Sequence, residues 1–397
     1  MKFLHVVGSM NPTGGGPAQG IRNLANHMLE YGNTVEAVCL DETDSDYLSQ
    51  VSFPIHTLGL GRAPWNYNPA LLPWLNKNLP RFDAVIMNGL WQYQSYAVST
   101  AAQVPGRPAY YIFPHGMLDP WFQRAPERRV KAIRNWLYWK IIEHRVLANA
   151  AAVFFTCNEE MRLARRSFRP YNPKREISVG YGVTPPPKYH IGMGKAFTEK
   201  CPGIKEKPYL LFLSRIHSKK GIDLLLESYS TICRADSGLS RSSMPHLVIA
   251  GPGLETAYGQ KMQKMAVDLC PPNSVFWPGM LTGDAKWGAL YNCEAFILPS
   301  HQENFGIAPV ETLACGRPVL ISDQVNIWRE IKEDGAALVQ KDTSEGTRQL
   351  LLDWIGLSAE AKTNMAAQAE ACFERHFSID YVTRKLLAAI VTSSNRQ

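Results

Sequence analysis

Two glutamates, Glu303 and Glu311, flank a glycine-containing turn in the second half of the chain. Pro309 is predicted to take the first position of a helix, where its missing N–H costs nothing, so that Glu311 falls in the first turn. The amides before the helix can then bind hydroxyl or phosphate oxygens. These amides belong to Asn304, Phe305, Gly306 and Ile307. The arrangement suits a sugar that carries phosphates; the alternative is that Glu311 only complements the helix dipole and Glu303 is solvated.

A basic loop, Ser214–Gly221, follows the predicted strand Tyr209–Leu213 and contains Arg215 and Lys220. A guanidinium and an ammonium at a strand end can neutralise a departing diphosphate. Gly251 follows another predicted strand and allows a ligand to approach the backbone closely. A solvated basic loop and a plain chain turn are the corresponding alternatives.

A run of glycines that includes Gly15 and Gly16 precedes the predicted helix Gly20–Tyr31. A glycine loop before a helix N-terminus suits a diphosphate, although a flexible turn explains it equally well. The dinucleotide fingerprint needs a glycine where Gln19 stands, and the Gly-Lys-Ser/Thr of a P-loop is missing. The run therefore does not indicate hydride transfer.

His115 comes directly after the predicted strand Ala109–Phe113. A histidine at a strand end can donate to, or accept from, a reacting hydroxyl near neutral pH. A lone histidine is more often a structural hydrogen-bonding group, so both interpretations stay open.

The elements that must position these residues form an alternating pattern of short apolar runs and helical segments. This alternation predicts an α/β fold with parallel sheets covered by helices on both faces. The predicted strands are Lys2–Val7, Thr34–Leu40, Ala84–Met87, Ala109–Phe113, Ala152–Thr156, Glu176–Val179, Tyr209–Leu213, His246–Ala250, Val275–Trp277, Ala295–Leu298, Val319–Ile321 and Ala336–Val339. Ligands of such sheets bind beyond the carboxyl ends of the strands.

A linker is predicted between residues 182 and 208, where Thr184–Pro187 and Gly192–Gly194 interrupt the alternation. We therefore place the boundary near residue 190, with domains of residues 1–190 and 191–378. Two doubly wound, Rossmann-like domains joined there are expected to face each other across a cleft. The remaining segment, residues 379–397, contains a last helix at about Ile379–Thr392.

Composition excludes several classes of protein. A chain of 397 residues with 45% hydrophobic and 19% charged residues is long enough for two folded domains. The eight scattered cysteines indicate neither a metal clip nor a disulfide framework, and they suit a reducing, cytoplasmic compartment. No apolar run reaches membrane-spanning length, and no secretory signal peptide is expected. A net charge of +7 without a recognised module argues against nucleic acid as a partner.

The segment Trp121–Ala148 mixes basic and aromatic residues at helical spacing. Such a face can contact anionic lipid headgroups as a peripheral membrane surface. The preferred interpretation is an ordinary amphipathic helix whose aromatic side is core and whose charges are solvated.

Several of these motifs stand in an order that resembles the retaining GT-B glycosyltransferases of family 4, also called glycosyl transferases group 1. The ordered motifs are Ser214-Arg215 with Lys220-Gly221, Gly251–Gly253, Phe276–Leu281, Glu303 to Glu311, and Ala314–Val319. In the first half, Gly14–Gly16 and Pro114–Met117 look like the phosphate loop and the acceptor-side histidine of that family. The resemblance covers nearly the whole chain, and its strength lies in the order of the motifs.

The resemblance implies a role for each candidate residue. The donor diphosphate would be held by Arg215, Lys220 and the backbone of Gly15, Gly16 and Gly251. The nucleoside would be held by Glu311 and by the backbone near Leu281. The transferred sugar would be held by Glu303 and the amides of Asn304, Phe305, Gly306 and Ile307, with His115 near its ring and the acceptor. Catalysis would then depend on His115, Arg215, Lys220 and Glu303.

The same resemblance implies transfer of a hexose, most simply glucose from UDP-glucose, to a saccharide or lipid-linked saccharide of surface or exopolysaccharide synthesis. No metal and no other cofactor is expected, since the basic residues can stabilise the leaving diphosphate. The final helix is expected to cross back to the first domain, as in relatives.

Two rival functions use the same features. A nucleotide-sugar 2-epimerase shares the scaffold, but it needs acid and base groups around the second carbon of the sugar and no acceptor. A non-catalytic binding protein for carbohydrates or nucleotide-sugars would retain Glu303 and Glu311 and yield no product with any acceptor.

Overall fold

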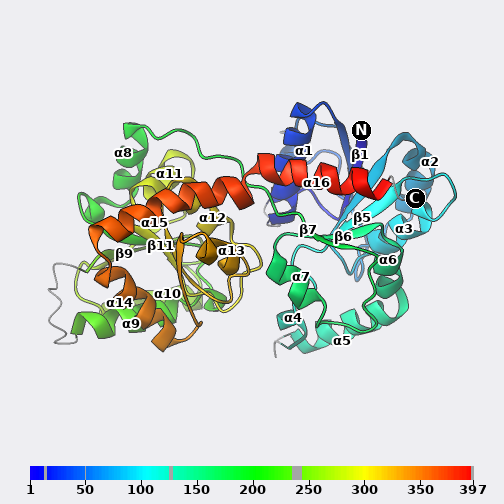
Figure 1. The fold of residues 1–397 in the computed structure, drawn as a ribbon. Helices are drawn as coiled ribbons and strands as arrows, with labels where there is room; N and C mark the ends of the chain where they lie inside the picture. Colours follow the sequence, from blue (N-terminus) through cyan, green and yellow to red (C-terminus); the bar gives the residue numbers. More distant parts are fainter. Residues whose placement is uncertain (13–15, 50, 125–127, 235–243, 395–397) are drawn as a thin grey trace. The chain divides into compact units, whose positions relative to one another are not determined.

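The computed structural model describes residues 1–12, 16–49, 51–124, 128–234 and 244–394. The chain divides into two compact units (Figure 1). Unit 1 consists of Met1–Thr184 and Ser378–Gln397, and unit 2 consists of Pro185–Phe377. Each unit is a parallel sheet with helices on both faces, so the predicted α/β fold class of two Rossmann-like domains is confirmed.

Unit 1 has a seven-stranded sheet in the order β3-β2-β1-β4-β5-β6-β7. The strands are β1 (Lys2–Val7), β2 (Thr34–Cys39), β3 (Ile55–Thr57), β4 (Ala84–Asn88), β5 (Ala109–Phe113), β6 (Ala152–Phe155) and β7 (Glu176–Ser178). The helices are α1 (Gly16–Glu30), α2 (Leu71–Asn78), α3 (Tyr93–Ala102), α4 (Trp121–Arg124), α5 (Arg129–Tyr138), α6 (His144–Asn149), α7 (Asn158–Ala164) and α16 (Ile379–Ser394). A π-helical turn, Trp139–Glu143, joins α5 to α6.

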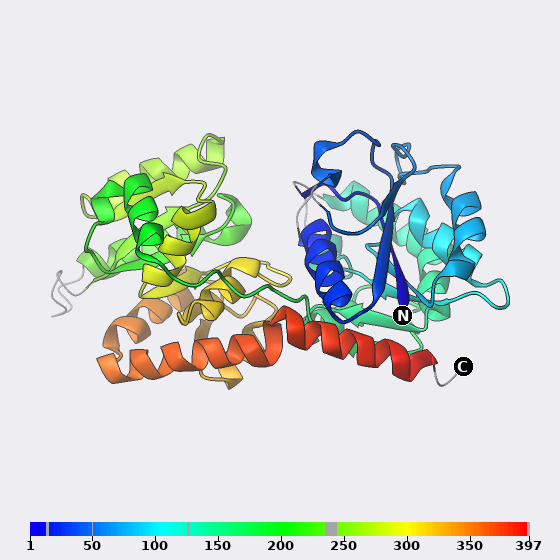
Figure 2. The ribbon, with the colours of Figure 1, turned by 90° about the horizontal axis from the view of Figure 1, so that it is seen from above.

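Two apolar clusters cover the faces of this sheet, and neighbouring residues of one strand belong to different clusters. Leu4 packs with α2, α3 and α6, whereas Phe3 packs with α1 and α16. This division follows from the two-residue period of a strand, which points successive side chains to opposite faces. Figures 1 and 2 show α16 beside α1, and Leu386 and Ile390 of α16 belong to the second cluster.

Unit 2 has a six-stranded sheet in the order β10-β9-β8-β11-β12-β13. The strands are β8 (Tyr209–Leu213), β9 (His246–Ala250), β10 (Val275–Gly279), β11 (Ala295–Leu298), β12 (Val319–Ser322) and β13 (Ala337–Gln340). The helices are α8 (Ile191–Lys200), α9 (Ile222–Arg234), α10 (Ala257–Leu269), α11 (Gly283–Asn292), α12 (Ile307–Ala314), α13 (Trp328–Glu333), α14 (Ser344–Gly356) and α15 (Ala359–Cys372). Its central strands are almost entirely buried, as expected of a doubly covered sheet.

The fold differs from the sequence prediction at β3, α1 and α8, and several other element bounds shift by one or two residues. Strand β3 was not predicted, because it is a three-residue edge strand whose side chains are only half-buried. Helix α1 begins at Gly16, one turn before the predicted start. The predicted linker was wrong for Gly192–Gly194, which lie inside α8, because the buried side chains of Met193 and Phe197 hold that helix against α11.

Candidate functional site

The strand order of unit 2 reverses between β8 and β11, and ligands of doubly wound sheets bind beyond the carboxyl ends of strands at such a reversal. The loops that follow these two strands carry Lys220 and Glu303, whose ammonium and carboxylate form an ion pair. Lys220 is buried and Glu303 is half-buried. The structure therefore brings together two residues that the sequence predicts for the diphosphate and for the transferred sugar.

Close packing fixes Lys220 at this position. The next residue, Gly221, has φ +68°, and a Cβ there would lie 2.1 Å from the carbonyl oxygen of Pro299. Ser300 Oγ and His301 N both donate to the carbonyl oxygen of Lys219, at 2.9 and 2.8 Å. The loop after β8 thus packs directly on the end of β11. A side chain at position 221 would force one of these two segments to shift.

The backbone of Glu303 is held by the loop after β12. Its N–H donates to the carbonyl oxygen of Gln324 at 3.0 Å, and its own carbonyl oxygen accepts from the N–H of Asn326 at 3.0 Å. These two bonds form a short bridge between the two loops. Because the backbone is fixed on both sides, the carboxylate of Glu303 stays beside Lys220.

Arg215 lies at the end of β8 and is exposed. Within the part of the chain that the structure describes, its guanidinium has no carboxylate partner. Gly251, at the end of the neighbouring strand β9, has φ +144°, and a Cβ there would lie 1.8 Å from the carbonyl oxygen of Ser214. Gly251 therefore allows the loops after β8 and β9 to touch. Arg215, whose charge no carboxylate offsets in the described part of the chain, lies in the first of these two loops.

Helix α12 begins at Ile307, two residues before the predicted start. Gly306 precedes it with φ +81°, so the turn needs a glycine there. Pro309 consequently takes the third helical position, and Glu311 lies in the second turn; both sequence predictions were wrong, because the glycine begins the helix earlier than the proline suggests. Gly316 follows the helix with φ +67° and forms a left-handed cap.

The turn that leads into α12 contains a buried aromatic side chain. The side chain of Phe305 is buried and packs edge-to-face on Phe377, with ring centroids 5.8 Å apart. The first-turn amides of α12, including that of Ile307, are ones that the helix itself cannot satisfy. Such amides can bind oxygen atoms of a ligand.

Glu311 accepts a bond from Lys286 Nζ at 2.6 Å, and both side chains are largely buried. Burial raises the pKa of Glu311 above its ordinary value, and the charge of Lys286 opposes this rise. Lys286 belongs to α11, and its ammonium also lies 4.6 Å from the ring centroid of Trp287. Leu281, predicted to contribute its backbone, follows β10 in the chain and is buried. Sequence reasoning missed Lys286, since nothing local marks it as a partner of Glu311.

In unit 1, His115 follows β5 with φ +52°. Its Nε2 and the Oδ1 of Asn88 are 3.1 Å apart, and Asn88 Nδ2 lies 3.2 Å from Nδ1 of the buried His5. This row gives His115 the tautomer that is protonated on Nε2, because the amide oxygen can only accept. Burial, and secondarily the nearby His5, lowers the pKa of His115 to about 3. Its imidazole is therefore neutral near pH 7 and does not change charge there.

Glu160, the third residue of α7, holds the loop that contains His115. Its carboxylate accepts from the N–H of Gly116 at 2.6 Å and from the N–H of Thr156 at 2.7 Å. It also accepts from the hydroxyl of Thr156 at 2.5 Å. Three bonds to one buried carboxylate join the loops after β5 and β6, so Glu160 positions the backbone next to His115.

Glu143 has a comparable role at the loop after β4. It lies in the π-helical turn, is completely buried, and accepts from the N–H of Trp91 at 2.8 Å. Trp91 has φ +70°, so this bond stabilises an uncommon backbone conformation. Burial raises the pKa of Glu143 to about 7. No local pattern marks Glu143 or Glu160 as partners of Trp91 and Gly116, which are distant in the chain.

The glycine run before α1 is described only in part. Gly15 lies outside the described residues, and Gly16 is the first residue of α1. The hydroxyl of Tyr181 donates to the carbonyl oxygen of Gly16. A Cβ on Gly20 would lie 2.8 Å from the ring of Tyr181, so Gly20 serves packing of this tyrosine.

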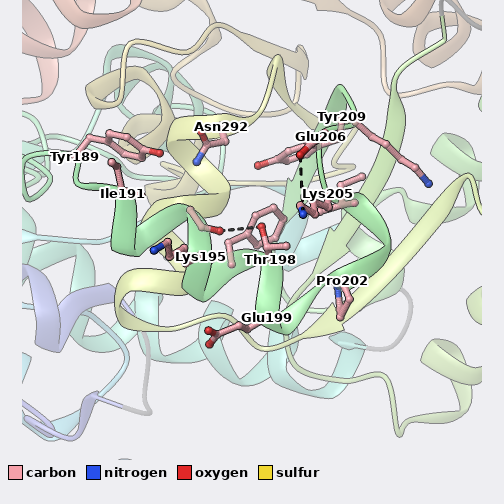
Figure 3. Close-up of a pocket in the computed structure, with 14 residues that line it drawn as sticks. Tyr189, Ile191, Lys195, Thr198, Glu199, Pro202, Lys205, Glu206, Tyr209 and Asn292 are labelled. Atoms are coloured by element: carbon pink, nitrogen blue, oxygen red, sulfur yellow. Dashed lines mark hydrogen bonds and ion pairs between the residues drawn. The ribbon is translucent and has the colours of Figure 1, made fainter.

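A groove of about 810 Å³ lies in unit 2 near the start of β8, whereas the candidate residues follow strand ends (Figure 3). Its walls come from α8, from residues 202–207 and from Tyr209, the first residue of β8. The candidate residues described above follow the last residues of the strands. The groove is thus a separate surface from the candidate site.

Several broader features concern the described residues alone. No three His, Cys, Asp or Glu side chains there are grouped as a metal site would require. No helix in those residues is both long and apolar enough to cross a membrane. The eight cysteines, all of which the structure describes, form no disulfide, and seven of them are buried.

Comparison with known proteins agrees with this architecture. The family described as "Glycosyl transferase 4-like domain" matches residues 15–180, and the family described as "Glycosyl transferases group 1" matches residues 196–371. A D-inositol 3-phosphate glycosyltransferase of Actinosynnema mirum is 29% identical over 185 residues, which span 45% of this chain and 43% of that protein. The chain spans less than half the length of the curated relatives that it matches first.

Solved structures of low sequence identity share the fold. A glycosyltransferase of Rickettsia africae has a TM-score of 0.76 at 15% identity, over 100% of this chain and 99% of that one. The Anabaena protein HepE, solved with UDP and glucose, has a TM-score of 0.72 at 14% identity, over 99% and 100% of the two chains. The two family matches lie one in each half of the chain, in the order of the two Rossmann-like units. The chain belongs to the GT-B glycosyltransferases of group 1.

Proposed function

We propose that this protein is a retaining glycosyltransferase that moves a hexose from a UDP-sugar to a saccharide or lipid-linked saccharide. The observation that carries the proposal is the ion pair of Lys220 and Glu303 at the strand reversal of unit 2, beside the exposed Arg215. A nucleotide-sugar has the complementary features, namely two negative phosphates and a ring of hydroxyls. Arg215 and Lys220 would bind the phosphates, and Glu303 would accept bonds from the hydroxyls.

The nature of the donor is supported by a relative of the same fold. HepE was solved with UDP-glucose, which makes UDP-glucose the first donor to test on this chain. Glu311 would bind the ribose hydroxyls, because its carboxylate lies beside Lys286, whose charge opposes the rise in pKa that burial causes. The backbone near Leu281 would contact the base.

The chemistry begins with cleavage of the bond between the anomeric carbon and the phosphate oxygen. The bonding electrons pass to the diphosphate, whose growing charge Arg215 and Lys220 stabilise, and the sugar becomes oxocarbenium-like. The acceptor oxygen then bonds to the anomeric carbon from the same face, and its proton passes to the departing phosphate oxygen. This route retains the anomeric configuration without a covalent intermediate. A metal is not needed in it, because the two basic side chains supply the positive charge.

His115 would act as a neutral group on the acceptor side. With a pKa of about 3 it is not a charged acid at neutral pH, so its role would be to orient hydroxyl groups of the sugar or the acceptor by hydrogen bonding. We place this activity in the cytoplasm, since the eight cysteines, seven of them buried and none in a disulfide, suit a reducing compartment. Its proposed role there is in surface or exopolysaccharide synthesis.

The first test is thermal unfolding of the whole protein with UDP, GDP, ADP or NAD, with EDTA present. A ligand at 100 times its dissociation constant adds about 2.7 kcal/mol to the free energy of unfolding, which shifts the midpoint measurably. Stabilisation by UDP in EDTA is expected. A response to GDP or ADP alone would change the donor, and a response to NAD alone would contradict the proposal.

The second test is product formation. Incubation with UDP-glucose and a panel of saccharides should release UDP and yield a glycoside with the anomeric configuration of the donor, as read by NMR. An inverted product would refute retention. A changed sugar in the nucleotide-sugar without any acceptor would favour the 2-epimerase, and UDP binding without any product would favour the non-catalytic binding protein.

A further inference from the structure

Helix α5, which Figure 1 shows on the outside of unit 1, and the π-helical turn after it expose large apolar side chains. We call this set the α5 ridge. Its members, with their exposed fractions, are Val130 (83%), Ile133 (63%), Trp136 (51%), Leu137 (48%) and Ile141 (65%). Burying such side chains away from water is favourable, so a contiguous exposed set of this kind marks an interaction surface.

The spacing of four of these residues shows that they share one side of the helix. Val130, Ile133, Leu137 and Ile141 are separated by three, four and four positions, which is the period of a helical face. The opposite side packs on the rest of unit 1 through the buried Tyr138 and Trp139. The sequence interpretation in which the aromatic side is core is therefore correct for Trp139 and wrong for Trp136.

Among the described residues 128–149, the charged side chains that are not buried all have one sign. Between residues 128 and 149, the acidic side chain that the structure describes is Glu143, and it is buried. The basic side chains of this stretch are Arg128, Arg129, Lys131, Arg134, Lys140 and Arg145. None of them pairs with a carboxylate among the described residues. Two lie over aromatic rings instead: Arg128 over Phe122 and Lys140 over Trp136.

We propose that the α5 ridge and its basic flanks form a docking surface for the headgroup region of an anionic lipid bilayer. Apolar side chains would enter the boundary of the acyl chains, and the lysines and arginines would contact the phosphates. Trp136 suits the depth between the two zones, because its indole is amphipathic. This inference rests on the proposed function and deepens it, since it places unit 1 at the surface where a lipid-linked saccharide is found.

A protein partner would need different chemistry. An acidic protein surface complements the basic flanks, but it offers a fixed set of carboxylates, whereas here the unpaired cations surround a broad apolar strip rather than face discrete positions. A fluid bilayer accommodates both features at once. The test therefore uses lipid vesicles and treats self-association or binding of protein as an opposing outcome.

The experiment is co-sedimentation of the whole protein with vesicles of phosphatidylcholine alone or with about 30% phosphatidylglycerol, at low and high salt. The protein is expected to sediment with the anionic vesicles and not with the neutral ones, and added salt should weaken binding. The variant Ile133→Gln/Leu137→Gln should lose binding by about 10-fold or more, because it removes apolar area while glutamine keeps helix propensity. Lys131→Gln/Lys140→Gln should also bind less and show a weaker salt dependence.

Helix α10 of unit 2 offers matched controls. Val267→Gln removes an apolar side chain that is also 83% exposed, and Lys261→Gln/Lys264→Gln removes two exposed lysines. Both should sediment as the parent protein does. The proposal is wrong if the parent stays in the supernatant of anionic vesicles, if the Ile133/Leu137 variant binds as well as the parent, or if the ridge variants change only the oligomeric state. Vesicle binding needs no turnover, so its failure is distinguishable from failure of the proposed transfer.

Discussion

The two sheets have the same kind of strand order, yet the loops at their carboxyl edges are stabilised in different ways. In unit 1, buried carboxylates accept bonds from backbone amides: Asp41 from Met10, Glu143 from Trp91, and Glu160 from Gly116 and Thr156. In unit 2, charged side chains pair with each other, as Lys220 does with Glu303 and Lys286 with Glu311.

The loops of unit 1 are therefore fixed in place, whereas the paired side chains of unit 2 can exchange partners. A carboxylate bound to amides of its own chain holds the backbone, and removal of the carboxylate leaves buried donors unsatisfied. An ion pair between two side chains can open when a ligand brings charges and hydroxyl groups of its own. Under the proposed function, unit 2 would change its contacts when the donor binds, whereas the loops of unit 1 would stay in place.

The largest effect is expected from Lys220→Ala. If this ammonium stabilises the leaving diphosphate, turnover should fall by roughly 10²–10³, as for loss of a single oxyanion donor. The initial rate of UDP release measures it, with thermal unfolding as a check of folding.

Lys219→Ala is the control, because Lys219 has the same side chain one residue earlier and is more exposed than the buried Lys220. The control should retain most of the parental rate. Equal rates for the Lys220 variant and the parent would remove the proposed role of Lys220.

A smaller effect is expected from Glu160→Gln, which tests the fixed side of the comparison. The amide keeps the shape but turns one acceptor into a donor that faces N–H groups, so the loop of His115 should shift. Such a shift would misplace His115 relative to the substrates and is expected to lower turnover by up to about 10²-fold. Stabilisation by UDP should be unchanged, since Glu160 belongs to unit 1.

Glu159→Gln is the matched control for this prediction. Glu159 is adjacent in sequence and forms an ion pair with Arg162. It should leave turnover near the parental value, because its ion pair with the exposed Arg162 does not involve the loop of His115. If both variants behave alike, Glu160 has no special role in positioning the loop.

The smallest effect is a dependence of stability on pH that comes from Glu143. Its pKa is about 7 in the folded protein and ordinarily 4.5, so the folded state binds the proton more tightly. Its stabilising contribution is complete below pH 4.5 and is lost as the pH rises through 7.

The variant Glu143→Gln has no carboxyl group to ionise, so it lacks this loss of stability. Its side-chain amide oxygen can still accept from the N–H of Trp91. Its thermal midpoint, relative to the parent, should therefore rise by a few degrees between about pH 4.5 and pH 8. His5 and His115, whose lowered pKa values make the protein less stable on acidification, are present in both proteins and cancel in the comparison. A difference that does not vary with pH would contradict the raised pKa of Glu143.

Much of the fold followed from local patterns, because buried parallel strands are short continuous apolar runs. The sequence predicts β8, β9 and β11 with their observed bounds. It does not predict β3, which has little apolar area to reveal it, or α8, whose glycines disfavour a helix that tertiary packing nevertheless stabilises.

The candidate site was predictable to the extent that its residues follow strand ends. Arg215, Lys220, Gly251 and Glu303 could be found in this way, and the structure adds the contact between Lys220 and Glu303. Lys286, Glu143 and Glu160 could not be found, because each acts on a residue at least 25 positions away in the chain. Only the tertiary structure brings such partners together.

The order in which the two units occur along the chain has a consequence for biosynthesis. Unit 2 is inserted between Thr184 and Ser378, and the chain enters and leaves it at one place, where the N–H of Ile379 donates to the carbonyl oxygen of Val183 at 2.9 Å. Helix α16, which covers Ile21 and Leu24 of α1, is thus made after all of unit 2. During translation, unit 2 can fold while unit 1 still exposes the apolar face that α16 will cover, so the first unit to be made is the last to be finished.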